Sequence, residues 1–479
     1  MAHQIPERDD TWRRCCIMSS RQTRLGHRQR KLETQFRTGA RRLKGARAVL
    51  LLFVGLAAAS FAIHHRLRGH KAPEDVAITE AAAVPSLDET IARAVGYLIR
   101  ICDPNGRFLY RQNLDGVSVE PRYNVLRHAG AVYALADYHH HTKDEDARGA
   151  VLRAAGYLLR HHVKPLETQP ELLAVWSLPD EETRDGRPLA KLGGAALGLI
   201  ALIEARRIDA DAVPMDTLES LGRFLTFMQR PSGGFFSRYD ESLGADRYFV
   251  SLYYPGEAIL ALTMLFEQTH DPRWLNAAAK GTSFLIQERE HVPVERLPAD
   301  HWLMIASARL EKHLPGLTDA SLTRGALLRH NHEVARMMLA EQARVTEEWA
   351  SGSFVADGRS TPTATRLEGL LALYGWLDAD DPLRPEIADA AATAVAFLRR
   401  CQVTTGPAEG GITRALRKLN TESTSFNSRQ SEIRIDYVQH ALSGWLEYRA
   451  HGLDAPARAL RIFPLRPATS FQRVMGGGN

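Results

Sequence analysis

Four acidic residues stand at or near the starts of segments that are otherwise almost wholly apolar: Glu257, Asp300, Glu368 and Asp436. Cleavage of a glycosidic bond needs two carboxyl groups, about 5–5.5 Å apart for retention and about 6.5–9.5 Å apart for inversion. Glu257 and Glu368 are the favoured pair because they lie inside their predicted helices. Asp300 and Asp436 can also be explained as N-caps or first-turn acids. Paired carboxylates therefore favour a glycoside hydrolase.

Bases, acids and cations at the same places allow a second chemistry. The candidate bases are His128, His301 and His440, the candidate acids are Tyr253 and Tyr254, and the candidate cations are Arg127, Lys191 and Arg366. A base that removes a proton beside a carbonyl, with a cation to stabilise the resulting anion, suits a lyase or an epimerase acting on a uronate or an amino sugar. His440 has a simpler alternative, a histidine buried in an apolar core.

Four more residues complete the predicted contacts with a substrate: Tyr123, Asn124, Trp302 and Tyr437. Aromatic rings offer flat apolar faces with a polar edge, which suits stacking against a sugar. A glycan or sugar is therefore the expected partner. Because a binding funnel and an active site use the same residue types, a non-catalytic glycan-binding or envelope-assembly protein is a third alternative.

These residues must be positioned by helices, and the helices repeat. A large apolar residue followed by leucine ends one class of amphipathic segment six times, at spacings of 60, 67, 60, 54 and 59 residues: Tyr97-Leu98, Tyr157-Leu158, Phe224-Leu225, Phe284-Leu285, Met338-Leu339 and Phe397-Leu398. Amphipathic helices of this kind suit an outer layer.

A second class of segment alternates with the first and is apolar and rich in small residues. These segments begin near residues 123, 189, 253, 300, 363 and 436. Glycine costs a helix up to about 1 kcal/mol relative to alanine, so its repeated use indicates close packing around an axis. Six outer and six inner helices in alternation predict an all-α fold, an (α/α)6 toroid over residues 87–462.

The connections of this toroid are asymmetric. Those from an outer to an inner helix are long, covering about 103–122, 161–188, 230–252, 287–299, 342–362 and 402–435. Long loops in a compact domain are usually functional. They all fall at the end where the inner helices start, so the candidate residues above should converge on one funnel there.

The N-terminal segment predicts contact with a membrane. Residues 1–47 carry 13 lysines and arginines against four acidic residues, a net charge of +9, and are followed by the uncharged segment 48–63 and a linker over 64–86. A signal-anchor helix, a cleaved signal peptide and a buried core helix are the alternatives. The positive-inside rule favours an anchor with the body outside the cytoplasm, periplasmic or extracellular, or secreted after cleavage. Residues 463–479 form a C-terminal tail.

Other functions have little support in the sequence. Because the whole chain carries +5, the residues after 47 sum to −4, so no nucleic-acid partner is predicted. Only Cys102 and Cys401 lie in the repeats and no zinc-ligand spacing, GxGxxG loop, Walker loop or GxSxG elbow occurs, so neither a metal nor a cofactor is expected. Cys102 and Cys401 occupy matching places in the first and last repeats, which leaves a disulfide or two buried thiols open.

A ring of this size resembles the six-hairpin glycosidases and the N-acylglucosamine 2-epimerase-like enzymes. The run Phe224-Leu225, Gln229 and Gly233-Gly234-Phe235 also resembles repeats of terpenoid cyclases and prenyltransferase β chains. The Asp-rich motif of the cyclases and the zinc ligands of the prenyltransferases are missing from the sequence. The resemblance covers most of 87–452, is architectural, and implies fold more than function.

Overall fold

The computed structural model describes residues 85–119, 123–179, 186–317, 322–420 and 422–454, and these residues are mostly helical. The outer helices are α3 (Leu87–Arg100), α5 (Glu145–His161), α7 (Met215–Phe227), α9 (Pro272–Arg289), α11 (Arg324–Ala343) and α13 (Leu383–Arg400). The inner helices are α4 (Val125–Thr142), α6 (Leu192–Ile208), α8 (Tyr254–Thr269), α10 (His301–Leu310), α12 (Ser360–Tyr374) and α15 (Ile435–Ala450). A short helix, α14 (Thr424–Asn427), precedes α15.

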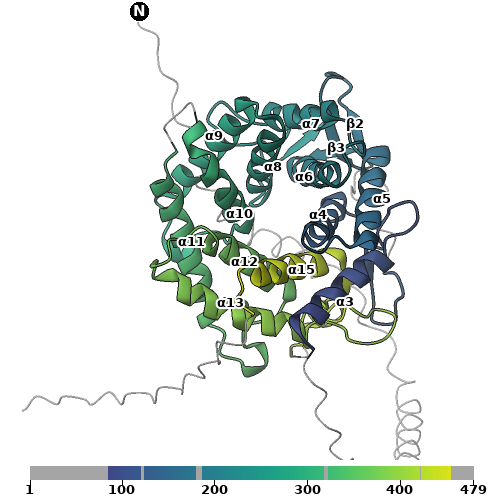
Figure 1. Ribbon diagram of the computed structural model, residues 1–479, viewed down its shortest axis with the longest axis vertical. Helices are drawn as coiled ribbons and strands as arrows, with labels where there is room; N and C mark the ends of the chain where they lie inside the picture. Colours follow the sequence, from purple (N-terminus) through teal and green to yellow (C-terminus); the bar gives the residue numbers. More distant parts are fainter. Residues whose placement is uncertain (1–84, 120–122, 180–185, 318–321, 421, 455–479) are drawn as a thin grey trace, which may run out of the picture. The chain divides into compact units, whose positions relative to one another are not determined.

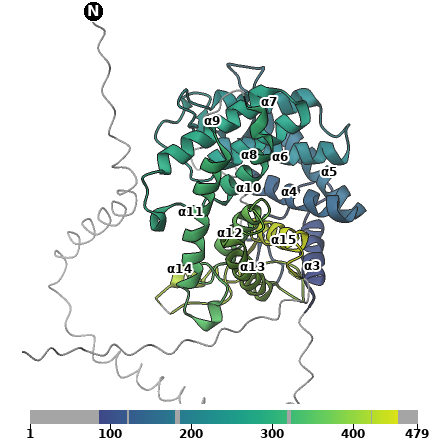
Figure 2. The same cartoon turned by 60° about the vertical axis from the view of Figure 1, so that its left-hand side comes forward.

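The inner helices form a closed ring. Each one packs against the next, and α15 packs against α4, so the last repeat meets the first (Figure 1). The turned view in Figure 2 shows α9, α11 and α13 outside α8, α10, α12 and α15. The predicted toroid of helical hairpins is therefore confirmed for the described residues.

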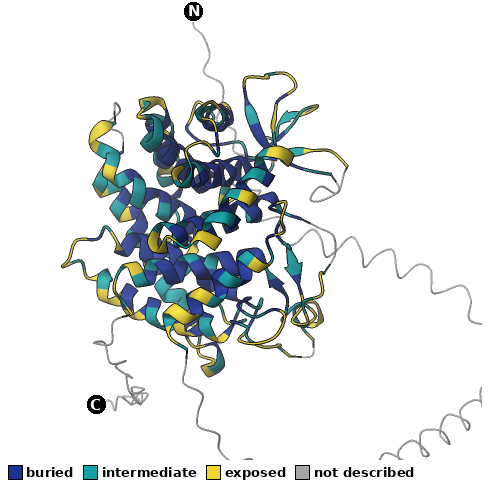
Figure 3. Ribbon diagram, turned by 45° about the vertical axis from the view of Figure 1, so that its right-hand side comes forward, coloured by how far each residue is buried: buried dark blue, intermediate teal, exposed yellow. Residues whose placement is uncertain are grey.

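Burial separates the two layers as the sequence pattern predicts. Every residue of α6 from Leu192 to Ala205 is buried, and so is every residue of α8 from Pro255 to Leu265. The outer helices bury one face and expose the other (Figure 3). Glycine permits the close approach of the inner helices, because a Cβ at Gly193 would collide with the Glu257 carboxylate and one at Gly256 with the backbone of α10.

Three glycine turns at the long-loop end pack against the outer helix of the following repeat. Gly106, Gly233 and Gly410 have φ values of 93°, 102° and 85°, a region that favours glycine. Each turn is closed by a single antiparallel bridge, Cys102–Phe108, Gln229–Phe235 and Gln402–Ile412. A Cβ at Gly410 would overlap the carbonyl oxygen of Arg93 in α3, so the turn of the last repeat lies directly against the first outer helix.

Short antiparallel strands rim the same end. The strands β2 (Val163–Pro165), β3 (Leu173–Ser177), β4 (Leu189–Lys191), β5 (Arg238–Asp240) and β6 (Gly244–Ala245) form one sheet in that order, with Ala190 opposite both Trp176 and Tyr239. The strands β1 (Arg111–Gln112) and β7 (Ile433–Arg434) pair with each other and join the loops of the first and last repeats.

Two further predictions concern the membrane and the cysteines. None of the described helices is long and apolar enough to cross a membrane. The predicted segments 1–47, 48–63 and 463–479 lie outside the described residues, as does the linker 64–86 except for its last two residues, so membrane anchoring stays a prediction. Cys102 and Cys401 are buried free thiols. The alternative of a disulfide between them is therefore wrong.

Candidate active site

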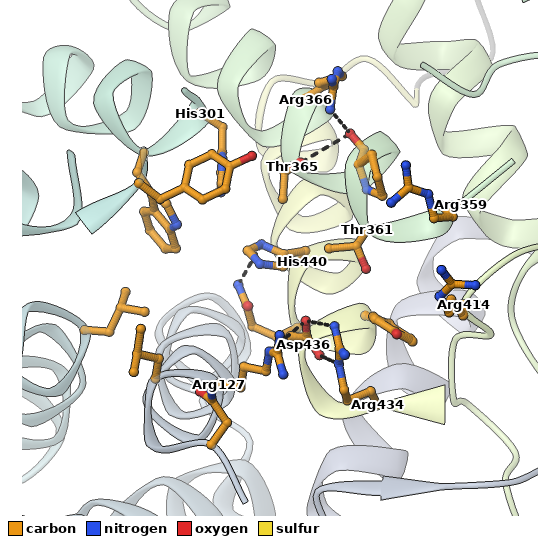
Figure 4. A pocket seen from close by; sticks show the side chains of 18 of the residues that line it. Arg127, His301, Arg359, Thr361, Thr365, Arg366, Arg414, Arg434, Asp436 and His440 are labelled. Atoms are coloured by element: carbon orange, nitrogen blue, oxygen red, sulfur yellow. Dashed lines mark hydrogen bonds and ion pairs between the residues drawn. The ribbon is translucent and has the colours of Figure 1, made fainter. Parts of the chain in front are cut away.

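A cavity of about 670 Å³ lies where the inner helices begin, a volume typical of small-molecule sites. Its walls come from α4, α6, α8, α10, α12 and α15 and from the loops before α12 and α15 (Figure 4). Eleven of the predicted site residues line it: Asn124, Arg127, Tyr253, Tyr254, Glu257, His301, Trp302, Arg366, Asp436, Tyr437 and His440. The predicted convergence of helix N-termini on one site is thus observed for most of the candidates.

Two histidines line this cavity and lie next to one buried glutamate, Glu368, which does not itself line it. His440 Nδ1 lies 2.7 Å from Glu368 Oε2, and His301 Nε2 lies 4.0 Å from the same oxygen. The two imidazole rings have their centroids 5.5 Å apart and are nearly perpendicular. Tyr253 packs edge-on against His301 at 5.2 Å. A carboxylate that binds Nδ1 of His440 fixes the ring orientation and leaves Nε2 for the cavity.

The environments of the two histidines move their pKa values apart. Burial lowers the pKa of His301 well below its usual value, and the nearby His440 and Arg366 lower it further. Burial also disfavours charge on His440, but the Glu368 carboxylate outweighs it and the pKa of His440 is raised. Neither ring nitrogen of His301 has a hydrogen-bond partner among the described residues. The cavity therefore holds two imidazoles whose pKa values are moved in opposite directions, an arrangement typical of acid–base pairs.

Glu257 is buried with one oxygen, Oε2, that has no hydrogen-bond partner in the described part of the chain. Burial, and to a smaller extent Asp300, raises the pKa of Glu257 to about 8. This side chain is thus a carboxylic acid at neutral pH that can donate a proton into the cavity.

Asp436 has the opposite character. Arg434 holds it with two bonds of 2.5 and 2.8 Å, and Arg127 Nε lies 3.1 Å from Oδ2. Burial would raise the pKa of Asp436, but the two arginines prevail and lower it to about 2. The carboxylate stays ionised and orients its two arginines, which makes it a poor proton donor.

Five predicted site residues do not line the cavity. His128 lies on the side of α4 that faces α5, where its Nδ1 is 2.6 Å from the Tyr123 hydroxyl and its Nε2 is 2.9 Å from the Ala154 carbonyl oxygen. Burial lowers the pKa of His128 to about 3. As residues of the cavity wall both predictions are wrong, since Arg127 and not its neighbour takes the inward position.

Asp300, Glu368 and Lys191 were also expected to face the cavity. Asp300 is the N-cap of α10, accepting from the Leu303 N–H at 3.2 Å and from Arg289 at 2.7 Å. Lys191 ends β4 and is the N-cap residue of α6. The structure corrects these predictions: Asp300 has the capping role that the sequence left open, and Glu368 acts behind His440.

The sequence analysis missed a group of polar residues in the cavity wall: Arg359, Thr361, Arg414, Arg429, Arg434 and Gln439. Four of them, Arg414, Arg429, Arg434 and Arg359, lie in the two loops that precede α12 and α15 or at their ends. The concentration of arginine in 414–434 was the available signal, but it gave no indication of which side chains turn inward.

One ligand atom from each of His301, Glu368 and His440 lies within 4.8 Å of the others. Two histidines and a carboxylate form a set that zinc accepts in catalytic sites. However, His440 Nδ1 is hydrogen-bonded to Glu368, the carboxylate that would have to be the third metal ligand. This geometry favours an imidazole–carboxylate pair over three converging ligands.

No family model matches the chain, and no curated protein matches it. Solved structures do. A D-mannose isomerase shares 15% identity over 78% of this chain and 100% of that chain, with a TM-score of 0.54. The cellobiose 2-epimerase of Bacillus thermoamylovorans shares 12% over 76% and 99%, with a TM-score of 0.57. A family 76 glycoside hydrolase from a bovine Bacteroides thetaiotaomicron strain shares 12% over 77% and 78%, with a TM-score of 0.54.

These similarities confirm the predicted resemblance to six-hairpin glycosidases and 2-epimerase-like enzymes at the level of the fold. Identities of 12–15% show the architecture alone. Function must therefore be argued from the cavity of this chain.

Proposed function

We propose that the protein is a sugar epimerase or isomerase that transfers a proton at the carbon beside a sugar carbonyl. The observation that carries this proposal is the pair of histidines in one cavity, His301 with a lowered pKa and His440 with a raised one. Enzymes that move protons at neutral pH commonly pair two titratable groups whose pKa values have been pushed apart. The second of the chemistries predicted from the sequence thus has more support than the first.

The proposed reaction has two steps. His301 takes the proton from the carbon, the C–H bond breaks, and its electron pair moves to the carbonyl oxygen to give an enediolate. The charged ring of His440 and the Arg127 guanidinium stabilise that oxygen. His440 then returns a proton to the carbon from the other face. Solvent exchange restores both rings to their starting protonation states, with Glu368 keeping His440 oriented.

The solved structures of similar fold support the proposal by analogy only. Two of those named above are an isomerase and a 2-epimerase of sugars. They share the fold of this chain, and one fold can serve many reactions.

A glycoside hydrolase is the second candidate, favoured by one observation. Glu257, with its pKa raised to about 8, could protonate a leaving group. The carboxylate that faces the cavity with it is Asp436, which is engaged by Arg127 and Arg434. Glu368, the other half of the predicted pair, is bound to His440. For hydrolysis, either Asp436 or Glu368 would have to be released from these partners to serve as the second catalytic carboxylate.

Incubation with sugars in D2O tests the proposal. Free aldoses and aminosugars should gain deuterium at the carbon beside the carbonyl and form an epimer or a ketose, both visible by NMR. New reducing ends from oligosaccharides without deuterium in the sugar would instead indicate a hydrolase, and an ultraviolet-absorbing product a lyase. Saturable binding without any product would identify a glycan-binding protein. Activity that survives dialysis against a chelator would exclude a metal at His301, Glu368 and His440.

We also propose that residues 48–63 anchor the protein in a membrane with the cavity outside the cytoplasm. The +9 charge of residues 1–47 supports this orientation, since each basic residue near an anionic surface contributes on the order of 1 kcal/mol. A reporter that is active only in the periplasm, fused after residue 86, should be active. An expressed but silent fusion would contradict the orientation.

A further inference from the structure

Arginine dominates the polar wall of the cavity. Six arginines line it, Arg127, Arg359, Arg366, Arg414, Arg429 and Arg434, whereas the lining acids are Asp436 and Glu257. Glu257 is held in its neutral form by burial, which raises its pKa to about 8. The proposed proton transfer involves Arg127 alone among the six. Most of this positive charge therefore has no role in the reaction described so far.

Carboxylates from the protein neutralise only part of this wall. Five arginines have a carboxylate partner: Arg127 and Arg434 share Asp436, Arg359 pairs with Asp357, Arg366 with Glu341, and Arg429 with Glu432. Arg414 is the exception. Within the described residues its guanidinium reaches no carboxylate, and its contacts are the Phe426 carbonyl at 3.4 Å and the face of the Phe426 ring at 4.6 Å.

The backbone fixes Arg414 beside two other arginines and a helix N-terminus. Ala415 forms an antiparallel β-bridge with Arg359, and the Ser360 N–H donates to the Arg414 carbonyl oxygen at 3.0 Å. The Arg414 N–H donates in turn to the Glu432 carbonyl oxygen at 2.8 Å. Burial lowers the pKa of Arg414, and Arg429 and Arg359 lower it further against the opposing influence of Tyr437 and Glu432. The site is therefore built to concentrate positive charge.

The first turn of α12 adds neutral donors to this charge. Its N-cap position has no side-chain hydrogen bond, and the Thr361 hydroxyl oxygen is buried without a partner among the residues described. Figure 4 shows Thr361 between His440 and the group formed by Arg359 and Arg414. An unpaired hydroxyl at a helix N-terminus together with arginines forms a favourable environment for an oxyanion.

We propose that Arg414, with Arg359, Arg429 and the Thr361 hydroxyl, binds an anionic substituent of the sugar substrate. The substituent is a carboxylate, a phosphate or a sulfate, which share the planar or tetrahedral oxygens that guanidinium groups bind in pairs. This inference rests on the proposed function, because it concerns the sugar whose reacting carbon lies between His301 and His440. It places the acidic group on the far side of His440 from His301.

Calorimetric titration of the full-length protein with four sugars tests this inference without requiring turnover. The probes are glucose, glucuronate, glucose 6-phosphate and glucose 6-sulfate, and the three charged sugars distinguish the source of the anion. At least one charged sugar should bind tenfold or more tightly than glucose, and the preference should weaken as salt is added. Equal affinity for charged and neutral sugars, or no measurable binding of any of them, would overturn the proposal.

Variants locate the effect. Arg414→Gln should reduce the affinity for the preferred charged sugar about tenfold or more while leaving that for glucose unchanged, and Arg414→Lys should recover part of it. Arg273→Gln, on the outer helix α9, is the matched control and should change neither the affinity for the charged sugar nor the affinity for glucose. Thermal melting of each variant shows that it is folded. A charged-sugar preference that survives Arg414→Gln and Arg359→Gln contradicts the site.

The two proposals fail in different ways. If wild-type protein prefers charged sugars but catalyses no proton exchange on them, the proposed reaction is wrong and the anion site stands. If proton exchange occurs with neutral and charged sugars alike, the reaction stands and the anion site is wrong.

Discussion

The two ends of the helical ring carry the same pair of residues in different surroundings. At the cavity end His440 lies 2.7 Å from Glu368, and at the opposite end His140 lies 2.7 Å from Glu204. Both glutamates are buried, and both pairs join neighbouring inner helices. The distance within the pair therefore does not distinguish a structural pair from a chemically active one.

The neighbours of the pair do distinguish them. Arg207 donates to both oxygens of Glu204, at 2.9 and 3.0 Å. Burial would raise the pKa of Glu204, but His140 and Arg207 outweigh it and the pKa is lowered. Nearby, Glu267 receives bonds from Arg309 and His313 in the same way. Each of these two glutamates is thus matched by an arginine, as expected of a structural network.

The cavity end is left incomplete by comparison. Both ring nitrogens of His301 and one oxygen of Glu257 lack partners in the part of the chain that the structure describes. Unsatisfied buried polar groups cost about 1–3 kcal/mol each, so a fold keeps them where they serve another purpose. The comparison teaches that the two ends differ in the surroundings of the pair and not in the pair itself.

The largest effect should come from His301. Replacing it with Gln removes the neutral base and should lower the rate of proton exchange by about 10²- to 10⁴-fold. His140→Gln, the equivalent change at the opposite end, should leave the rate within about twofold while lowering the melting temperature. Exchange rates by NMR in D2O measure both. Equal rates in the two variants would remove the distinction between the ends.

Glu368→Gln should have the next largest effect. It removes the negative charge that keeps the pKa of His440 raised against burial, so that pKa must fall. Activity that requires protonated His440 will then be lost at lower pH than in the wild type. We expect the alkaline limb of the pH–rate profile to move down and the maximal rate to fall about 10- to 100-fold. An unchanged alkaline limb would show that another group sets it.

Glu204→Gln tests the structural pair. Because the folded-state pKa of Glu204 is lowered, its stabilising contribution is present above the ordinary pKa of 4.5 and is lost as the pH falls through the folded value. At pH 7 the variant should lose about 1–3 kcal/mol, since Arg207 and His140 keep only a neutral partner. A melting curve lower by several degrees with normal exchange activity is the expected result. Reduced activity per folded molecule would contradict a purely structural role.

Glu257→Gln should have the smallest and the most pH-dependent effect on stability. The folded-state pKa of Glu257 is raised to about 8, so its contribution is complete below pH 4.5 and is lost as the pH rises through about 8. The wild type should therefore lose melting temperature between about pH 4.5 and 8 more steeply than the variant, by roughly a few degrees. Parallel curves would show that Glu257 is not protonated in the folded protein.

The ring itself could be predicted from the sequence because its signals are local and repeated. Pairs such as Tyr97-Leu98 and Phe397-Leu398 mark the outer helices, and both lie in buried positions at their ends. The inner helices followed from apolar composition, as α8 illustrates. Local patterns of this kind depend on side-chain period alone.

The site could be predicted only in part. Arg127 and His128 are neighbours in α4, and neighbours on a helix point about 100° apart, so only one can face the cavity. Nothing in an apolar helix start indicates which. Arg414 was missed for a different reason, because the loop that carries it is positioned by pairing with residue 359, more than fifty positions earlier. Contacts across such separations leave no local pattern.

The glycine turn at Gly410, which lies against Arg93 of α3, has a consequence for synthesis. The candidate site takes Arg127 from the first hairpin and Asp436 and His440 from the last, and these meet only when α15 docks on α4 and α3. Contacts between residues more than 300 positions apart form late in folding. Catalytic competence should therefore emerge in a single step once the sixth hairpin has emerged from the ribosome, and a nascent chain of five hairpins should hold an open, inert arc.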